Sequence, residues 1–380
     1  MIAICRKTIQ ALRTVLRRAL KITPRGPDPS VHFIADADSL VARAMTAHGA
    51  VEYRLPGGYQ PTAFWVPFTG LSRWQGKGRD LVKFELAETG ELSVTWIEGN
   101  VPQHQLLTAG EPESVDFPPM PAELVASPPN LLKSLQAAAA ATDDASGRYA
   151  LGCLHLRGGK QGRVAGTDGR HLFMHSGFAF PWSGDLLVPG SQVFGAADLP
   201  AQAVRVGASE NWATFCVGPW TIHLPIRKEG RYPRVEDSIP PVSFATAKLL
   251  VEKSDARFLA QALPKMPCAV DDQYSRITVD LDGEASLRSR DTGPTTELAL
   301  SNSFVRGQAR VSINRKYLMR AIDLGFREVW FFENVMACID GDRTYAWAHL
   351  DASGVISSRE NAIRVESPKI IKRETTAQAA

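Results

Sequence analysis

Two histidines four residues apart, His171 and His175, come nearest in this sequence to a metal-binding pair. A zinc site needs three or four ligands, and no third ligand lies at a useful spacing. Asp168 stands before Gly169 and could act as an acid on a turn, but no base accompanies it. An aspartate in that position more often ends a strand and accepts backbone N–H bonds. No Ser-His-Asp, paired-carboxylate or Cys-His pattern stands out, so we expect no catalysis, no metal and no cofactor.

Two further features could carry chemistry, and neither forms a recognisable site. The segment Gly158-Gly159-Lys160 resembles a phosphate-binding loop, but the pattern GxxxxGK[ST] is absent and strand patterns flank it, so we expect a hairpin turn. The cysteines are odd in number and at least 50 residues apart, which excludes a CxxC zinc or redox spacing. They fit a reduced, cytoplasmic setting. These cysteines are Cys5, Cys153, Cys216, Cys268 and Cys338.

Basic residues on amphipathic helices are the remaining candidates for function. In the helix expected over residues 7–20, apolar side chains at Ile9, Leu12, Leu16 and Leu20 share one face, and basic side chains share another. Taken alone, such a face is ordinary solvated surface, but its recurrence at equivalent positions favours contact with DNA phosphates that does not read sequence. The residues we expect to face DNA on these helices are Arg6, Arg13, Arg17, Arg73, Lys77, Lys133, Lys316 and Arg320.

One unit of about 120 residues is written three times along the chain. Its first helix is expected at residues 7–20, 129–141 and 254–266, so that the starts lie 122 and 125 residues apart. A second helix follows a short apolar strand in each copy, near Leu71 and Trp74, near Val193 and Phe194, and near Tyr317 and Leu318. Asn314 is a good N-cap for the third of these. Strand pairs over 82–96, 204–224 and 329–347 close the units.

The domain boundaries follow from this phase and from clusters of proline. Prolines interrupt the chain near residues 118–121 and at Pro240-Pro241. We therefore expect domains at 1–118, 119–243 and 244–352, each with two helices packed on antiparallel sheets, an α+β fold. The polar remainder, 353–380, is expected to form a flexible tail that could bind a partner.

Composition limits the class of protein. The chain has 380 residues, is 44% hydrophobic and 22% charged, and carries 43 basic against 40 acidic residues, a net charge of +3. These values are ordinary for a globular protein, and no apolar run is long enough for a membrane span. The first 27 residues hold seven basic groups and no acid, which an organellar presequence would also show. The first repeat begins inside that segment, which favours the cytoplasmic reading.

The middle copy resembles the bacterial DNA polymerase III beta subunit, the sliding clamp, at three places. The segment Thr167-Asp168-Gly169-Arg170-His171-Leu172 follows Arg148-Tyr149-Ala150-Leu151, as a similar motif does in that family. Gly230-Arg231-Tyr232-Pro233, with Pro240 beyond it, is a second similarity, and Ile313-Asn314-Arg315-Lys316-Tyr317-Leu318 is a third. The resemblance is most specific over 119–243, good over 244–350, and rests on the repeat phase in 1–118.

The resemblance implies a ring of two protomers, head to tail, with sheets outside and helices lining a hole around double-stranded DNA. It implies a non-catalytic processivity factor, bacterial, cytoplasmic and associated with the nucleoid, without a membrane partner. It adds Arg148 and Tyr149 to the residues expected to face DNA. A clamp loader and a replicative or repair DNA polymerase would dock a short peptide in a pocket whose wall includes Leu151, Thr167, Gly169, Arg170, His171, Leu172, Pro240, Ala346, Ala348, His349 and Leu350.

Departures from the family pattern leave alternatives open. The family's His-Arg order is Arg170-His171 here, and its closing Val-Met-Pro-Met-Arg is Trp347-Ala348-His349-Leu350-Asp351, followed by about thirty further residues. One alternative is a clamp-like paralogue with a regulatory, accessory or decoy role and altered partner specificity. Another is an unrelated basic enzyme acting on DNA, against which the lack of a catalytic pattern argues. In the family the dimer contact joins first and third domains, which points to the strand near Val101–Leu107 and to Leu263.

Overall fold

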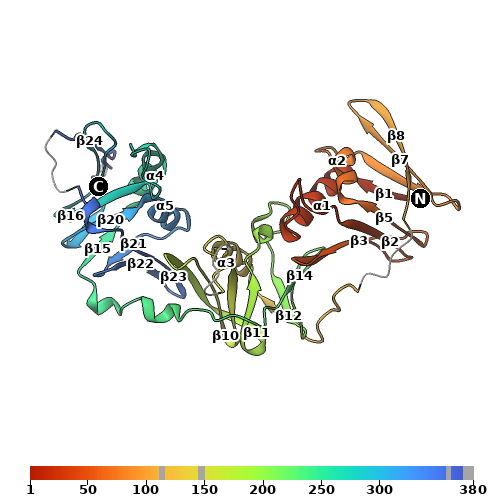
Figure 1. Cartoon of the computed structure of the whole chain (residues 1–380), viewed down its shortest axis with the longest axis horizontal. Helices are drawn as coiled ribbons and strands as arrows, with labels where there is room; N and C mark the ends of the chain where they lie inside the picture. The colour runs from red at the N-terminus through yellow and green to blue at the C-terminus, as the bar shows by residue number, and fades with distance from the viewer. Residues whose placement is uncertain (111–115, 144–149, 357–360, 371–380) are drawn as a thin grey trace, which may run out of the picture. The chain divides into compact units, whose positions relative to one another are not determined.

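The computed structural model describes residues 1–110, 116–143, 150–356 and 361–370 (Figure 1). It is an α+β protein whose strands are mostly antiparallel. Two compact units make up the chain: the first comprises residues 1–166 and 176–232, and the second comprises 167–175 and 233–380. The sequence therefore folds into fewer compact bodies than it has repeats, and the division into three domains at 1–118, 119–243 and 244–352 stays a prediction.

The first unit contains two antiparallel sheets and a long strand pair. The smaller sheet has the order β1 (Ile2–Cys5), β6 (Leu81–Leu86), β7 (Glu91–Glu98) and β8 (Val101–Thr108). The larger has the order β5 (Thr62–Pro67), β2 (Ser30–Ala35), β3 (Ser39–Thr46), β4 (Gly49–Pro56), β14 (Trp220–Pro225), β13 (Trp212–Val217), β12 (Val204–Ala208) and β9 (Val125–Ser127). Because β4 pairs with β14, one sheet continues across the boundary expected near residue 118.

The strand pair consists of β10 (Cys153–Thr167) and β11 (His171–Pro189). The assigned range of β10 includes Gly158-Gly159-Lys160, but a Cβ at Gly162 would lie 2.9 Å from the Arg157 carbonyl oxygen, so the chain reverses between these two residues as the expected hairpin turn requires. Gly159 has φ +93°, a conformation that side chains other than glycine rarely adopt. Gly159 therefore lies in the turn.

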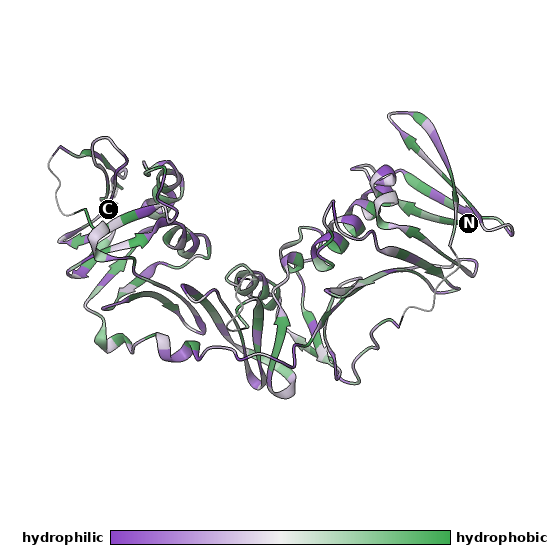
Figure 2. Ribbon diagram, in the orientation of Figure 1, coloured by the Kyte–Doolittle hydropathy of each residue, from purple (hydrophilic) through white to green (hydrophobic). Residues whose placement is uncertain are grey.

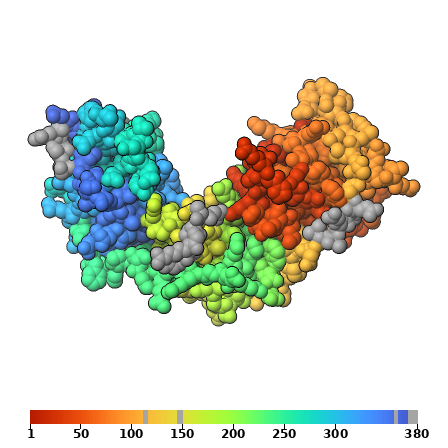
Figure 3. Space-filling view, in the orientation of Figure 1, coloured from red at the N-terminus to blue at the C-terminus, as the bar shows by residue number. Residues whose placement is uncertain are grey.

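Helices of the first unit pack on these sheets through the apolar faces expected from the sequence. They are α1 (Arg6–Ala19), α2 (Leu71–Trp74) after a 3₁₀ turn at Phe68–Gly70, and α3 (Asn130–Ala139). The four apolar positions of the predicted face, three in α1 and Leu20 just after it, are all buried, at 0–1% exposure. Hydrophilic and hydrophobic residues both appear along α1 in Figure 2, and α1 forms part of the visible surface in Figure 3. One face of α1 thus packs against the protein interior, and the other face is exposed to solvent.

A second helix expected in the middle repeat is absent from the described chain. Residues Gln192–Gly195 form a single 3₁₀ turn, η2, capped by the Ser191 hydroxyl, which accepts from the Val193 N–H. Val193 and Phe194 are buried as expected. Gly195 weakens a helix, and Pro200 restricts the residue before it, so the segment has no sequence support for further turns.

The second unit contains two sheets and two helices. One sheet joins the first five residues of β11 to β23 (Arg343–Ala348), β22 (Val335–Asp340), β21 (Glu328–Phe331), β15 (Ala247–Leu250) and β19 (Phe304–Gly307). The other has the order β20 (Ala309–Asn314), β16 (Arg276–Asp282), β17 (Glu284–Ser289), β18 (Thr296–Leu300) and β24 (Ile363–Glu366). Helices α4 (Lys253–Ala262), which continues into a 3₁₀ turn at Leu263–Lys265, and α5 (Arg315–Asp323) pack against each other (Figure 1). As predicted, the Asn314 side chain caps α5 by accepting from the Lys316 N–H at 2.9 Å.

Residues beyond 352, expected to form a flexible tail, include a strand. Ala352–Gly354 form a 3₁₀ turn, and Ile363–Glu366 add β24 to the second sheet in parallel with β18. Ser367 beyond it is 2% exposed. The expected tail is therefore docked on the sheet over Ile363–Ser367, and residues 371–380 lie outside the described part of the chain.

Candidate functional site

A tight turn at Asp168-Gly169 begins the candidate site in the second unit. Oδ1 of Asp168 accepts hydrogen bonds from the backbone N–H groups of Arg170 and His171, both at 2.8 Å. Gly169 has φ +86°, which glycine adopts without strain. The Thr167 hydroxyl accepts from the Gly169 N–H and donates to the His171 carbonyl. Asp168 thus terminates a strand, as its sequence setting predicts, and holds the two basic residues that follow.

His171 is fixed by this turn and by aromatic neighbours. Its Nδ1 lies 2.9 Å from Oδ1 of Asp168, and its ring stacks on Tyr317 of α5 at a centroid distance of 4.6 Å. Burial by itself would raise the pKa of Asp168, but the contact with His171 and the two backbone N–H groups hold that pKa below its usual value. His171 is 9% exposed. It therefore orients the turn from beneath and offers little surface to a ligand.

Strand β23 lies beside the turn and supplies small side chains. Leu172 is the register partner of Ala346, and the Ala348 N–H donates to the Arg170 carbonyl at 2.9 Å. Ala346 belongs to a buried apolar cluster with Phe332 and Ala337. The partly buried side chains of Ile239, Ala245, Trp330, Val335 and Ile339 pack against that cluster. Because alanine leaves space where a larger residue would fill it, this part of the sheet is hollowed.

A cavity of about 480 Å³ opens at this hollow, entirely within the second unit. Eight of the eleven residues that the family resemblance places in a pocket line it: Thr167, Gly169, Arg170, His171, Leu172, Pro240, Ala346 and Ala348. Nine lining residues were not foreseen: Pro233, Val235, Ser238, Ile239, Phe332, Glu333, Asn334, Val335 and Trp347. For part of this second group the sequence carries a signal: the apolar pair Phe331-Phe332 directly precedes the turn at Glu333-Asn334.

Three residues expected in the pocket lie elsewhere. Leu151 is 8% exposed, belongs to the first unit and does not line the cavity. His349 and Leu350 line a smaller cavity of about 230 Å³ with Arg170, Tyr274 and Tyr317. Burial holds the pKa of His349 below its usual value, so its ring stays neutral near pH 7. The end of β23 thus borders both cavities: Ala348 lines both, whereas His349 and Leu350, which follow the strand, line only the smaller one.

The larger cavity has the chemistry of a peptide groove. Leu172, Val235 and Phe332 give it apolar walls, and the exposed residues Arg170 and Glu333 place opposite charges on the lining. The Arg170 guanidinium lies 5.1 Å from the Tyr274 ring centroid. Such a site can receive an apolar side chain of an extended peptide while the edge groups contact its backbone or charged residues.

Basic residues on helices form the second candidate surface. Arg17 of α1, Arg73 of α2 and Lys133 of α3 are exposed in the first unit, as is Lys77 just after α2, and Lys316 of α5 is exposed in the second. Arg13 and Arg320 are only half-buried and contact protein groups: Arg13 donates to Gln75, and the Arg320 guanidinium lies 5.8 Å from the Tyr345 ring centroid. Arg148 and Tyr149 lie outside the described residues.

Arg6 does not face solvent, so the expectation that it contacts DNA is wrong. It is 8% exposed, and its guanidinium donates to the backbone carbonyls of Trp74, Gln75 and Ile97. The last carbonyls of a helix have no partner within the helix, and Arg6 satisfies them at the end of α2. Arg315, the first residue of α5, does the same for the carbonyls of Leu263 and Met266 at the end of α4. In each of these two helix pairs, one arginine thus serves the structure.

In the described residues, the fold brings no set of metal ligands together around His171 and His175. Within the part of the chain that the structure describes, no three His, Cys, Asp or Glu side chains gather into a group able to hold a metal ion. Among the same residues, none of the helices has the length and apolar character needed to cross a bilayer.

Solved structures with the same architecture exist at low sequence identity. No protein-family model and no curated protein sequence matches the chain. The DNA polymerase III beta subunit of Borrelia burgdorferi superposes with a TM-score of 0.75 at 12% identity, covering 92% of this chain and 97% of that one. The beta subunit of Streptococcus pyogenes gives 0.75 at 14% identity, with 92% and 99% covered. The DNA polymerase sliding clamp of Bacillus subtilis gives 0.75 at 14%, with 92% and 98% covered. The chain therefore has the fold of the DNA polymerase III beta subunits, the bacterial sliding clamps.

Proposed function

We propose that this protein is a DNA sliding clamp, a non-catalytic processivity factor that encircles double-stranded DNA and tethers a polymerase. The observation that carries the proposal is the cavity at Leu172 and Ala346, which stands on a clamp fold at the place where the family resemblance predicts a partner pocket. In this proposal the three repeats are three domains, and two protomers close head to tail into a ring. A clamp loader opens that ring, and the protein works in the cytoplasm on the nucleoid.

The partner of the cavity is a short extended peptide with apolar side chains. A fluorescein-labelled panel of pentapeptides with leucine or phenylalanine at alternate positions tests this by fluorescence anisotropy. At least one member should bind the parent protein, and the Leu172→Asp variant should lose binding, because a carboxylate would then stand in the apolar wall. Leu250→Asp is the control, since Leu250 is 40% exposed and does not line the cavity. Binding that survives Leu172→Asp would place the peptide elsewhere.

Topological retention on DNA tests the ring itself. A closed clamp slides off linear duplex but stays on a circle until the circle is cut, whereas a protein held only by charge dissociates from both as salt rises. We expect retention on nicked circular DNA, in the presence of a clamp loader, that ends after linearisation. Equal retention on linear and circular DNA at moderate salt would contradict the clamp.

One structural observation favours the second candidate, a clamp-like paralogue with altered partners. Asp351, which stands where the family has a basic residue, caps the following 3₁₀ turn by accepting from the Ser353 N–H at 2.8 Å. The Ser353 side chain and then this backbone N–H hold the pKa of Asp351 below its usual value by hydrogen bonding. The Asp351 carboxylate therefore stabilises the turn with which the C-terminal extension begins. Failure of every peptide in the panel, together with ordinary DNA retention, would favour the paralogue.

A further inference from the structure

The C-terminal segment closes a strand edge of its own sheet. Strand β24 runs parallel to β18, with Ile363 opposite Thr296 and Val365 opposite Leu298. The Ile363 N–H donates to the Thr295 carbonyl at 2.8 Å, and the Ser367 N–H donates to the Ala299 carbonyl at 2.9 Å. We call residues 361–370 the strap. Without it, β18 would present unpaired backbone groups at the end of the sheet.

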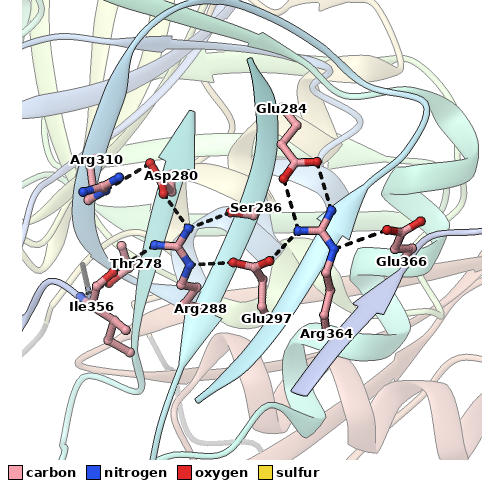
Figure 4. A network of polar contacts seen from close by, with 10 residues as sticks. All are labelled: Thr278, Asp280, Glu284, Ser286, Arg288, Glu297, Arg310, Ile356, Arg364 and Glu366. Carbon is pink, nitrogen blue, oxygen red and sulfur yellow. Dashed lines mark hydrogen bonds and ion pairs between the residues drawn. The ribbon is translucent and has the colours of Figure 1, made fainter. Parts of the chain in front are cut away.

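Arg364 is the main side-chain attachment of the strap, as Figure 4 shows. Its guanidinium donates to both carboxylate oxygens of Glu284, at 3.1 and 2.9 Å, and to Oε1 of the buried Glu297 at 2.5 Å. Nε lies 3.2 Å from Glu366 of the strap itself. A bidentate arginine–carboxylate pair is both stronger and more specific in geometry than a single contact.

A second attachment lies just beyond β24. The Ser367 hydroxyl donates to Oδ1 of Asp255, the buried aspartate of α4, at 2.6 Å. Asn302 then holds the end of the strap, because its side chain donates to the Pro368 carbonyl and accepts from the Ile370 N–H. Polar contacts therefore fix the strap at both ends.

The strap contributes almost nothing to the hydrophobic core. Its apolar side chains remain in water: Ile363 is 57% exposed and Val365 is 45% exposed. Beneath it, Arg288 keeps its own ion pairs with Asp280 and Glu297, both at 2.6 Å. A segment held by polar contacts with little buried apolar area opens locally at low cost in free energy, so the strap can leave while the sheet stays folded.

The first unit offers a strand that could take the strap's place. In the described residues β8 is the last strand of its sheet, and its sequence, Val101–Thr108, contains no Asp, Glu, Lys or Arg. Val101 and Leu106 are 55% and 54% exposed. Edge strands usually carry charges that prevent pairing with another chain, and β8 lacks that protection.

We propose that the strap is an autoinhibitory strand: docked, it occupies the β18 edge in cis, and released, it lets β18 pair with β8 of a second copy of this chain. The contact joins two different surfaces, so it is heterologous and can close a ring of two. The inference rests on the proposed clamp function and adds its regulation. Detachment of the strap becomes the step that permits the ring to close.

Sedimentation equilibrium over a micromolar dilution series tests the proposal on the full chain and on a chain that ends at Ile356. The parent, of 41.4 kDa, should be mostly monomeric, and the shortened chain should dimerise with a dissociation constant lower by at least about tenfold. Arg364→Gln should move the equilibrium in the same direction. Arg310→Gln is the matched control, because Arg310 contacts Asp280 of the same network at 3.1 Å and forms no hydrogen bond or ion pair with the described residues of the strap.

Two results would overturn the proposal: unchanged association of both strap variants, or a dimeric parent that becomes monomeric when shortened. Leu106→Lys on β8, added to the shortened chain, should restore the monomer, and a dimer that survives it would exclude β8 as the pairing strand. Circular dichroism at the same concentrations shows whether each variant is folded. If Arg364→Gln unfolds, Ser367→Asp serves in its place, since it sets a carboxylate against Asp255.

Peptide anisotropy on the same samples separates the two proposals. The cavity at Leu172 shares no lining residue with the strap, so peptide binding should be equal in the parent and the shortened chain. If the peptide binds but association does not depend on the strap, the autoinhibitory role of the strap is excluded and the proposed clamp function stands. Strap-dependent association without peptide binding or DNA retention removes the clamp function and leaves the autoinhibitory strand.

Discussion

Arg288 of β17 and Glu297 of β18 face each other across the sheet as register partners, with Nε 2.6 Å from Oε2 and both side chains 1% exposed. Each is also bonded to a second group: Arg288 to Asp280 at 2.6 Å and Glu297 to Arg364 at 2.5 Å. The Arg288 guanidinium additionally donates to the Ile356 carbonyl. A charged chain of four side chains, Asp280, Arg288, Glu297 and Arg364, thus crosses the sheet of the second unit and reaches the strap.

We predict that Arg288→Met lowers the free energy of unfolding of the second unit by about 3–5 kcal/mol, because it leaves the buried Asp280 and Glu297 without their shared partner. Urea denaturation followed by tryptophan fluorescence measures the change. Arg310→Met is the control, and since the Arg310 side chain is 41% exposed we expect an effect below about 1 kcal/mol. Equal effects of the two substitutions would show that burial does not set the strength of the network.

Charge reversal on the helices should weaken DNA binding without unfolding the protein. We predict that Arg17→Glu, Arg73→Glu and Lys316→Glu together lower affinity for duplex DNA and reduce the slope of log affinity against log salt by about three, one for each lost phosphate contact. Filter binding over a salt series measures both quantities. An unchanged slope would show that these helices do not meet phosphates.

Arg6 provides the contrast to those positions. We predict that Arg6→Ala lowers the melting temperature, because it leaves three backbone carbonyls near α2 without their donor, while the salt slope of DNA binding stays that of the parent. Differential scanning calorimetry and the same filter-binding series test the two parts. A parent-like melting temperature with a reduced slope would return Arg6 to the DNA-binding set.

His223 should make the first unit sensitive to acid. It is 1% exposed, its Nδ1 lies 2.9 Å from the Thr214 hydroxyl, and burial lowers its pKa to about 4. The unfolded chain therefore binds a proton near pH 6.5 that the folded chain refuses until about pH 4. Stability that is present above pH 6.5 is lost as the pH falls through this window, by up to roughly 3 kcal/mol.

The substitution His223→Gln tests this, because glutamine cannot titrate there and can still contact Thr214. We expect its unfolding free energy to change less than that of the parent between pH 7 and pH 4.5 in urea titrations. His48→Gln, at an exposed position, is the matched control and should keep the pH dependence of the parent. Identical curves for all three proteins would exclude His223 as the group responsible.

Local pattern and periodicity predicted much of the secondary structure. The apolar face of α1, the helices near 130, 254 and 315, the Asn314 cap and the Asp168 turn are confirmed, because each depends on side chains within a few residues of one another. The absent second helix in the middle repeat shows the limit of repeat phase. A glycine and a proline there outweighed the register that the other two copies follow.

The pocket could be predicted only in part, because its lining residues come from segments that lie far apart in the sequence. The contiguous run Thr167–Leu172 was found, since a motif marks it, whereas Val235 and Phe332 come from distant parts of the chain and carry no motif. Leu151 is near that run in sequence but belongs to another compact unit. Cavity membership depends on which strands become neighbours, and pairing between distant strands is not visible in local spacing.

The sequence by itself determined the repeat, the helix faces and the turn, because these follow from the periods of 3.6 and 2 that backbone geometry imposes. Only the tertiary structure decided which charged residues are buried and which groups they contact. Arg6 looks like its neighbour Arg13 on a helical wheel, yet it is buried because the unpaired carbonyls of α2 lie within its reach. Arg364 lies in a polar segment that resembles a tail, yet it is held because it pairs with Glu284 and Glu297, which lie 80 and 67 residues earlier in the chain. Charged residues pair with the groups that the fold brings within reach, and the spacing of residues along the sequence does not give those distances.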